Sequence, residues 1–132
     1  MKIAATGFVY DGRDAPAHRK SCAFTNVYLS PDHTLYVSGR WGSERDSRDG
    51  HPCVFTSTDF GDTWELRYDG HGQWDWDGRH GENKCLVCTE LTPGELTATS
   101  LLVDRSHRER PFINPLTQGL LLMRVIHSKS SD

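Results

Sequence analysis

Short runs of apolar and β-branched residues, each bounded by polar turn residues, occupy the first half of the chain. Runs of about four to eight such residues between Gly, Pro, Asp or Ser are typical of β-strands. Four runs follow one another closely, so we predict an antiparallel four-stranded sheet over residues 22–69. Residues 1–21 are polar and broken by turn residues, and we expect them to be irregular. The predicted strands are Cys22–Leu29, Thr34–Arg40, Cys53–Thr56 and Trp64–Tyr68.

A second set of apolar runs lies within residues 70–132, where longer polar segments separate the runs. Residues 69–84 are rich in Gly, Trp, His and Asp, and residues 104–119 contain two prolines, so we expect both segments to be loops. The predicted strands of this second unit are Cys85–Leu91, Leu96–Val103 and Leu120–Ser128.

The residue types between the third and fourth predicted strands, over residues 57–64, indicate a specific tight turn. The carboxylate of Asp59 can accept hydrogen bonds from backbone N–H groups two or three residues on, and Gly61 supplies the positive φ of a tight turn. The hydroxyls of Ser57 and Thr63 can fix the two ends of the turn, and Trp64 begins the return strand with a large apolar side chain. These five residues are therefore predicted to be structural.

The pattern Ser-x-Asp-x-Gly-x-Thr-Trp resembles the Asp box, or BNR repeat, of sialidases and related β-propellers. The resemblance implies an all-β, sialidase-like β-propeller fragment, with one complete four-stranded antiparallel blade over residues 22–69 and most of a second blade over 70–132. The last three residues, Ser130–Asp132, repeat the opening Ser-x-Asp of the box. We therefore expect the chain to be the N-terminal portion of a longer propeller, ending inside a second box.

In such a blade the loop after the second strand and the segment before the first strand lie at one end, and the Asp box lies at the other. In sialidases an arginine before the first strand grips the sugar carboxylate, a Gly-Arg pair ends the second strand, and an acid/base aspartate follows in the loop. By this resemblance Arg19 and Arg40 bind substrate, Asp46 is the acid/base, and Asp49 is the alternative to it. Arg19 is followed by Lys-Ser instead of the family's aliphatic-Pro. From the residues alone, Arg40 and Asp46 could also be an exposed ion pair, and Asp49 a turn residue.

Two tryptophans in the predicted loop 69–84 are further candidates. If the segment is extended, Trp74 and Trp76 lie on one side and could stack on a sugar ring as substrate-binding residues, or they could cover the core. Cys85 and Cys88 form a CxxC pair, but residues three apart on a strand point to opposite faces and no second CxxC accompanies them. We expect free thiols, no metal site and no cofactor.

Composition narrows the range of partners. The chain has 132 residues, enough for one modest domain, and its 12 glycines and four tryptophans favour a turn-rich β protein. A formal net charge of −3 gives no basic surface for nucleic acid. No apolar run approaches the roughly 20 residues of a membrane helix, and the N-terminus is too interrupted for a signal peptide. We therefore predict a cytoplasmic protein without a membrane partner.

The leading functional hypothesis is a truncated, glycoside-hydrolase-like propeller whose intact parent acts on a carbohydrate, sialylated or otherwise. The resemblance implies a tyrosine nucleophile with a glutamate partner from later blades, so we do not expect the isolated chain to hydrolyse a sialoside. The alternative is a non-catalytic Asp-box propeller that serves as a carbohydrate-binding or protein-interaction scaffold. A further possibility is self-association through open blade edges.

Overall fold

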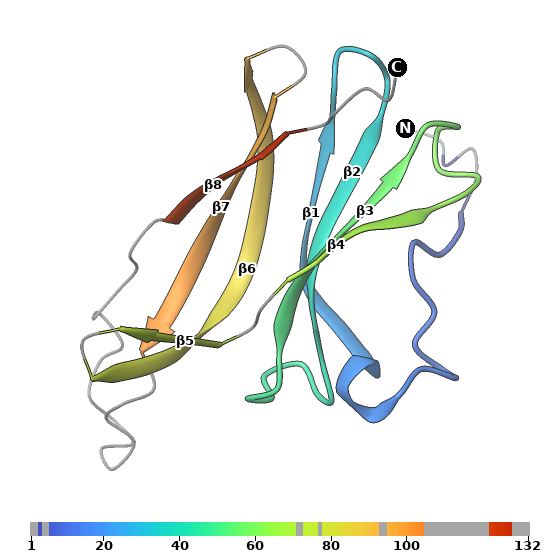
Figure 1. The fold of residues 1–132 in the computed structure, drawn as a ribbon. Coiled ribbons are helices and arrows are strands. Elements are labelled where there is room, and N and C mark those ends of the chain that lie inside the picture. Colours follow the sequence, from blue (N-terminus) through green and yellow to red (C-terminus); the bar gives the residue numbers. More distant parts are fainter. Residues whose placement is uncertain are drawn as a thin grey trace.

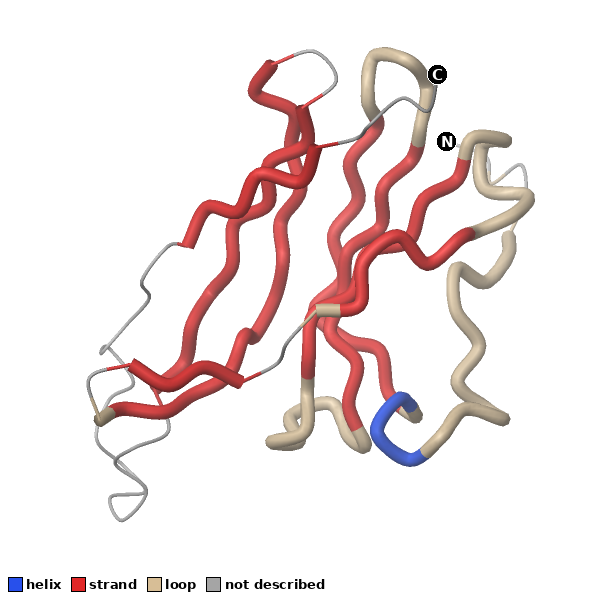
Figure 2. The backbone as a smooth tube through the Cα atoms, in the orientation of Figure 1, coloured by secondary structure: helices blue, strands red, loops and turns tan. Residues whose placement is uncertain are grey.

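Two four-stranded antiparallel sheets make up the fold, as seen in a computed structural model that describes residues 3, 6–70, 73–76, 78–92, 95–104 and 122–127 (Figure 1, Figure 2). In each sheet the strands lie side by side in sequence order. The all-β, antiparallel prediction is therefore confirmed. Within the described part of the chain neither sheet closes on itself, so each has two edge strands.

The first sheet matches the four strands expected from the hydrophobic pattern, with shifts of a few residues at their ends. A single turn of 3-10 helix, η1 (Ala17–Arg19), precedes it within an otherwise irregular N-terminal segment. The strands are β1 (Ser21–Leu29), β2 (Leu35–Gly42), β3 (His51–Ser57) and β4 (Glu65–Asp69).

The second sheet differs from the sequence prediction at its beginning. The prediction of a loop over residues 69–84 is wrong, because this segment contains a short strand and the first part of a long strand. Trp74 pairs with Gly81 and Trp76 with Arg79, and Gly78 between them has a φ of 70°. A glycine with positive φ is what a tight hairpin needs, so the Asp-Gly dipeptide in this segment was a turn signal between strands. The strands are β5 (Gln73–Trp76), β6 (Arg79–Thr92), β7 (Glu95–Asp104) and β8 (Leu122–His127).

The remaining predictions for the second unit have different outcomes. The three strands expected there correspond to β6, β7 and β8, so the sheet has one strand more than predicted. The loop predicted over 104–119 lies outside the described residues, apart from Asp104 at the end of β7. The second Asp box predicted at Ser130–Asp132 also lies outside them.

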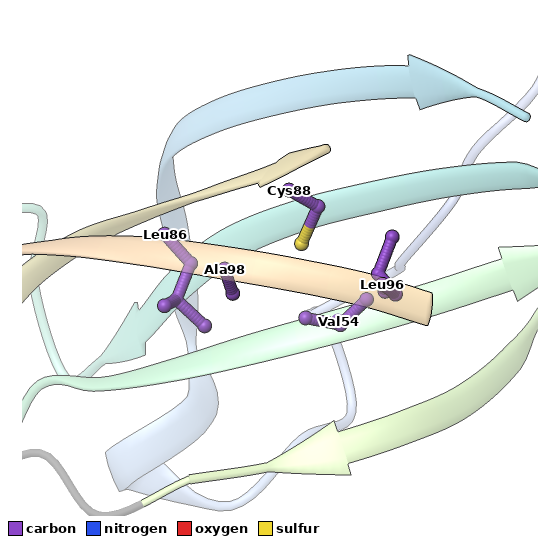
Figure 3. Packing of buried hydrophobic residues seen from close by; sticks show 5 residues of the cluster. All are labelled: Val54, Leu86, Cys88, Leu96 and Ala98. Carbon is purple, nitrogen blue, oxygen red and sulfur yellow. The ribbon is translucent and has the colours of Figure 1, made fainter. Parts of the chain in front are cut away.

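The two sheets pack face to face, and β3 is buried on both of its faces. Val54 of β3 points toward the second sheet and meets apolar side chains of β6 and β7 (Figure 3). Burying one such side chain stabilises the fold by about 1.5–3 kcal/mol, so this cluster holds the sheets together. Its other members are Leu86, Cys88, Leu96 and Ala98, with Tyr28, Tyr36 and Tyr68 packed around them.

The opposite face of the first sheet carries a second, aromatic cluster. Trp41, Cys53 and Phe55 are buried there, and Val9 and Tyr10 of the N-terminal segment cover them together with Trp64 of the turn between β3 and β4. The Tyr10 hydroxyl donates a hydrogen bond of 2.8 Å to the carbonyl oxygen of Arg19. The irregular N-terminal segment is therefore part of the folded core.

The turn over residues 57–64, between β3 and β4, is closed by side chains. Oδ1 of Asp59 accepts from the backbone N–H of Thr63 at 2.9 Å and from the hydroxyl of Ser57 at 2.7 Å. The N–H bound by Asp59 is therefore four residues on, one position further than expected. Phe60 and Gly61, which lie between the two residues, both have positive φ. Hydrogen bonds from Thr63 and Ser57 hold the pKa of Asp59 well below its usual value. The indole N–H of Trp64 donates to the carbonyl of Gly61 at 3.1 Å.

The sheet directions put this turn at one end of the molecule, while η1, the loop over residues 43–50 and the β5–β6 hairpin lie at the other end (Figure 1). We call that second end the rim. No helix among the described residues is long and apolar enough to cross a membrane.

Candidate functional site

Arg40 lies in the interior between the sheets. Alternation along β2 points Ser38 and Arg40 toward the second sheet, and only 1% of Arg40 is exposed. Its Nη2 is 3.2 Å from Oε2 of Glu82 on β6, whose side chain is also almost fully buried. The exposed Arg40–Asp46 ion pair considered from the sequence is therefore wrong: the acidic partner of Arg40 is Glu82.

The same guanidinium holds the loop that follows β2. Nη1 of Arg40 donates to the carbonyl of Arg45 at 3.1 Å, and Nη2 donates to the carbonyl of Ser47. These carbonyls flank Asp46, so one planar group fixes the backbone on both sides of the predicted acid/base. Gly50 makes room for it, because a Cβ at that position would lie 1.8 Å from Cζ of Arg40.

Asp46 projects from this loop at the rim, with 66% of its side chain exposed. Its carboxylate forms an ion pair with Nζ of Lys84, and the same Nζ lies 3.0 Å from Oε1 of Glu82. Four charged side chains are therefore linked in a series that starts in the interior and ends at the rim. We call Arg40, Glu82, Lys84 and Asp46 the rim charge network.

Sequence reasoning missed Glu82 and Lys84, because both residues fall in the loop predicted over residues 69–84. They have the same parity as Leu86 and Cys88, but the register of β6 with β7 shifts between Asn83 and Cys85, so a simple period-two pattern does not run back through Lys84.

Asp49 is a turn residue in the structure, which is the alternative role considered for it from the sequence. Its carboxylate accepts from the backbone N–H of Ser43 at 3.1 Å and from the Ser43 hydroxyl at 3.1 Å. Hydrogen bonds from the Ser47 and Ser43 side chains and the Ser43 backbone lower the pKa of Asp49 from its usual value. These bonds close the base of the loop that carries Asp46.

Arg19 lies on the other face of the first sheet. Its guanidinium carbon sits 4.3 Å from the centre of the Trp41 ring, and its Nη2 pairs with Asp69 of β4. Asp69 also accepts from Nε2 of His51 at 3.2 Å when that imidazole carries a proton there. Because Arg40 and Trp41 are consecutive on β2, the sheet separates Arg19 from Arg40. The chain does not bring these two predicted substrate-binding arginines together.

Phe24 adds an aromatic ring to the rim charge network. It lies at a bulge in β1, where the register with β2 shifts between Ala23 and Asn26, and its φ is 54°. Its ring centre is 5.6 Å from Cζ of Arg45 and 5.5 Å from Nζ of Lys84. A bulge re-aims a side chain, and here the re-aimed ring meets the loop of Asp46. Sequence reasoning missed it because Phe rarely adopts positive φ.

For the two remaining predicted substrate-binding residues, the structure describes the backbone but not the side chains. Trp74 and Trp76 belong to β5 at the rim, two positions apart along the strand, but their side chains lie outside the described part. Among the side chains that the structure describes, no three His, Cys, Asp or Glu groups are arranged to hold a metal ion.

No family model, no curated protein and no solved structure matches this chain. The resemblance to sialidases therefore rests on the residues of the chain itself, and the functional argument rests on the geometry of the rim.

Proposed function

We propose that this chain supplies the acid/base loop of a glycoside-processing Asp-box β-propeller, with Asp46 as the residue that transfers the proton. The proposal rests on the hydrogen bonds that Arg40 donates to the two backbone carbonyls on either side of Asp46. A catalytic group must be held within a fraction of an ångström of its working position. A buried guanidinium that fixes the backbone while the carboxylate stays exposed meets this requirement.

An exposed carboxyl group held in this way can act as the acid and base in glycoside cleavage. A carboxylic acid protonates the leaving oxygen, and a carboxylate then accepts a proton from the incoming water. In this proposal Lys84 orients the Asp46 carboxylate, and Glu82 holds Lys84 in turn. Arg40 is a positioning residue in this scheme, which departs from the substrate-binding role that the resemblance implies for it.

The proposal needs groups beyond the two sheets. Propellers close with about 4–8 blades, so further blades have to complete the ring. A nucleophile is also required, and the Tyr28–Glu90 pair does not provide it. The Tyr28 hydroxyl lies 3.3 Å from the Glu90 carboxylate, but both residues are near the end of the sheets opposite the rim. Burial raises the pKa of Tyr28, and a raised pKa makes a phenol less nucleophilic at neutral pH.

The test uses the full-length protein, with the further blades that the proposal requires. It compares aryl glycosides whose phenol leaving groups differ in pKa. Asp46→Asn should reduce turnover of the poor leaving group by about 10²–10⁴-fold and affect the good leaving group much less, because only the poor one needs a proton. Glu44→Gln, which removes an exposed charge from the same loop, is the matched control. Equal losses on both substrates, or full activity of Asp46→Asn, would contradict an acid/base role.

A second candidate is a non-catalytic scaffold that binds a carbohydrate or a protein. The observation that favours it is the pairing of both predicted substrate-binding arginines with carboxylates of the chain, Arg40 with Glu82 and Arg19 with Asp69. A scaffold of this kind would turn over none of the aryl glycosides. Ligand binding that is unchanged in Asp46→Asn, measured by calorimetry, would support it.

A further inference from the structure

Phe24 is held in a backbone conformation that costs free energy. Its φ is 54°, a value that residues with large side chains rarely adopt, because Cβ then crowds the following carbonyl oxygen. Such conformations persist only where the surrounding structure determines them, and they are common at functional sites. A glycine would relieve the strain, so we expect the ring of Phe24 to have a role that offsets it.

The bulge in β1 turns this ring toward the second sheet. Ala23 is opposite Arg40, whose side chain points to the second sheet, so regular alternation would send Phe24 to the outer face. The register shifts between Ala23 and Asn26, and the ring centre of Phe24 lies 5.5 Å from Nζ of Lys84 on β6. The strained conformation therefore brings the ring to the rim charge network.

A ring and two carboxylates contact the ammonium of Lys84. It forms an ion pair with Asp46, and it lies 3.0 Å from Oε1 of Glu82 and over the ring of Phe24. Only 14% of the Lys84 side chain is exposed, so the contact with the ring is largely removed from water. A cation within about 6 Å of an aromatic ring centre is attracted by the ring face, and more strongly where water is excluded. The ring therefore helps the carboxylates to hold the ammonium beside Asp46.

The same ring contacts the loop that carries Asp46. Its centre is 5.6 Å from Cζ of Arg45, the residue directly before Asp46, and the carbonyl of Arg45 accepts a hydrogen bond from Arg40. Phe24 thus contacts both the residue that precedes Asp46 and the residue that pairs with its carboxylate. The position of the loop and the position of Lys84 are therefore linked through one ring.

We propose that Phe24 is a positioning residue for Asp46. Its ring holds the Lys84 ammonium and the Arg45 guanidinium, so that the Asp46 carboxylate keeps one orientation at the rim. The consequence for proton transfer rests on the function proposed for Asp46, whereas the contact between Phe24 and Lys84 does not. The ring is not required to touch the substrate.

The first measurement follows acylation of lysine amines in the full-length protein by mass spectrometry. An amine reacts only without its proton, and the ring stabilises the protonated form of Lys84. Phe24→Leu keeps an apolar side chain but removes the ring, so labelling of Lys84 should become about 2–30-fold faster, the range that a cation–π contact is worth. Phe24→Tyr keeps a ring and should keep the native rate. Lys20, which is exposed and precedes β1, is the internal reference.

The second measurement is turnover of the aryl glycosides with poor and good phenol leaving groups. Phe24→Leu should slow cleavage of the poor leaving group by a similar factor and leave the good one unchanged, because only proton transfer by Asp46 is disturbed. Phe24→Tyr should retain native turnover, which a role in packing alone would not predict for both substrates. If Phe24→Leu does not fold, Phe24→Gly replaces it with the same expected results, since glycine accepts the positive φ.

Phe60→Leu is the matched control. Phe60 also has a positive φ, of 58°, but its side chain is 73% exposed in the turn over residues 57–64, at the end opposite the rim. This variant should change neither the labelling of Lys84 nor turnover.

An unchanged rate of Lys84 labelling in a folded Phe24→Leu would overturn the proposal, whatever the role of Asp46. Faster labelling with equal losses on both leaving groups, or with no loss, would also overturn it, because the ring would then not serve proton transfer. If the native protein turns over no aryl glycoside, the function proposed for Asp46 fails. The labelling rate alone then decides whether Phe24 holds Lys84.

Discussion

Arg40 and Glu82 form an ion pair between the two sheets, with Nη2 and Oε2 3.2 Å apart and both side chains almost entirely removed from water. Neither charge could be buried alone without a large cost. Because each sheet supplies one member, the pair favours the one arrangement of the sheets that brings the charges together. The same arrangement fixes the loop of Asp46 through the carbonyls that Arg40 binds.

Glu82→Gln should destabilise the fold by about 3–5 kcal/mol, because it leaves the Arg40 guanidinium buried without a counter-charge. The free energy of unfolding from urea titrations measures the effect. Glu44→Gln removes a charge of the same sign from an exposed position and should change stability by less than about 0.5 kcal/mol. A loss below about 1 kcal/mol in Glu82→Gln would show that water or another group satisfies Arg40.

Gly50→Ala tests the space that the Arg40 guanidinium occupies. The added methyl group would lie 1.8 Å from Cζ, so the side chain or the loop has to move, and overpacking of this kind costs about 1–3 kcal/mol. The matched control is Gly7→Ala, where an added Cβ meets no atom within 4 Å. The midpoint of thermal unfolding should be clearly lower for Gly50→Ala than for Gly7→Ala. Equal midpoints would mean that the loop over residues 43–50 is not held by Arg40.

Local patterns predicted the first sheet well because each of its strands has its own apolar run and turn residues. The rim charge network could not be predicted in the same way, since Glu82 is 42 positions from Arg40 and belongs to the other sheet. Residues 69–84 were expected to be a loop because charged and Gly residues outweighed the period-two alternation of β5 and β6. The bulge at Phe24 places its ring near Arg45 and Lys84, which are distant in the sequence, and no local preference of Phe indicates it.

Tyr10→Phe should loosen the N-terminal segment without unfolding the sheets. The change removes the 2.8 Å hydrogen bond to the Arg19 carbonyl but keeps the ring against Trp41 and Phe55. The expected loss of stability is about 1 kcal/mol. Limited proteolysis should then cut more readily within residues 6–16. An unchanged cleavage rate would show that ring packing alone holds the segment.

Asp59→Asn should weaken the turn over residues 57–64 in a pH-dependent manner. Hydrogen bonds from Thr63 and Ser57 hold the pKa of Asp59 below its value in the unfolded chain, which is about 3.9. A depressed folded-state pKa contributes stability that is fully present above the unfolded pKa and is lost as the pH falls through the folded pKa. The native protein should therefore unfold at a higher temperature than Asp59→Asn near pH 7, and the gap should narrow below about pH 4. Asp62→Asn removes one charge from the same turn but leaves the bonds to Ser57 and Thr63 in place, so it is the matched control. A gap between the native protein and Asp59→Asn that stays constant down to pH 2 would mean that the ionised carboxylate does not hold the turn.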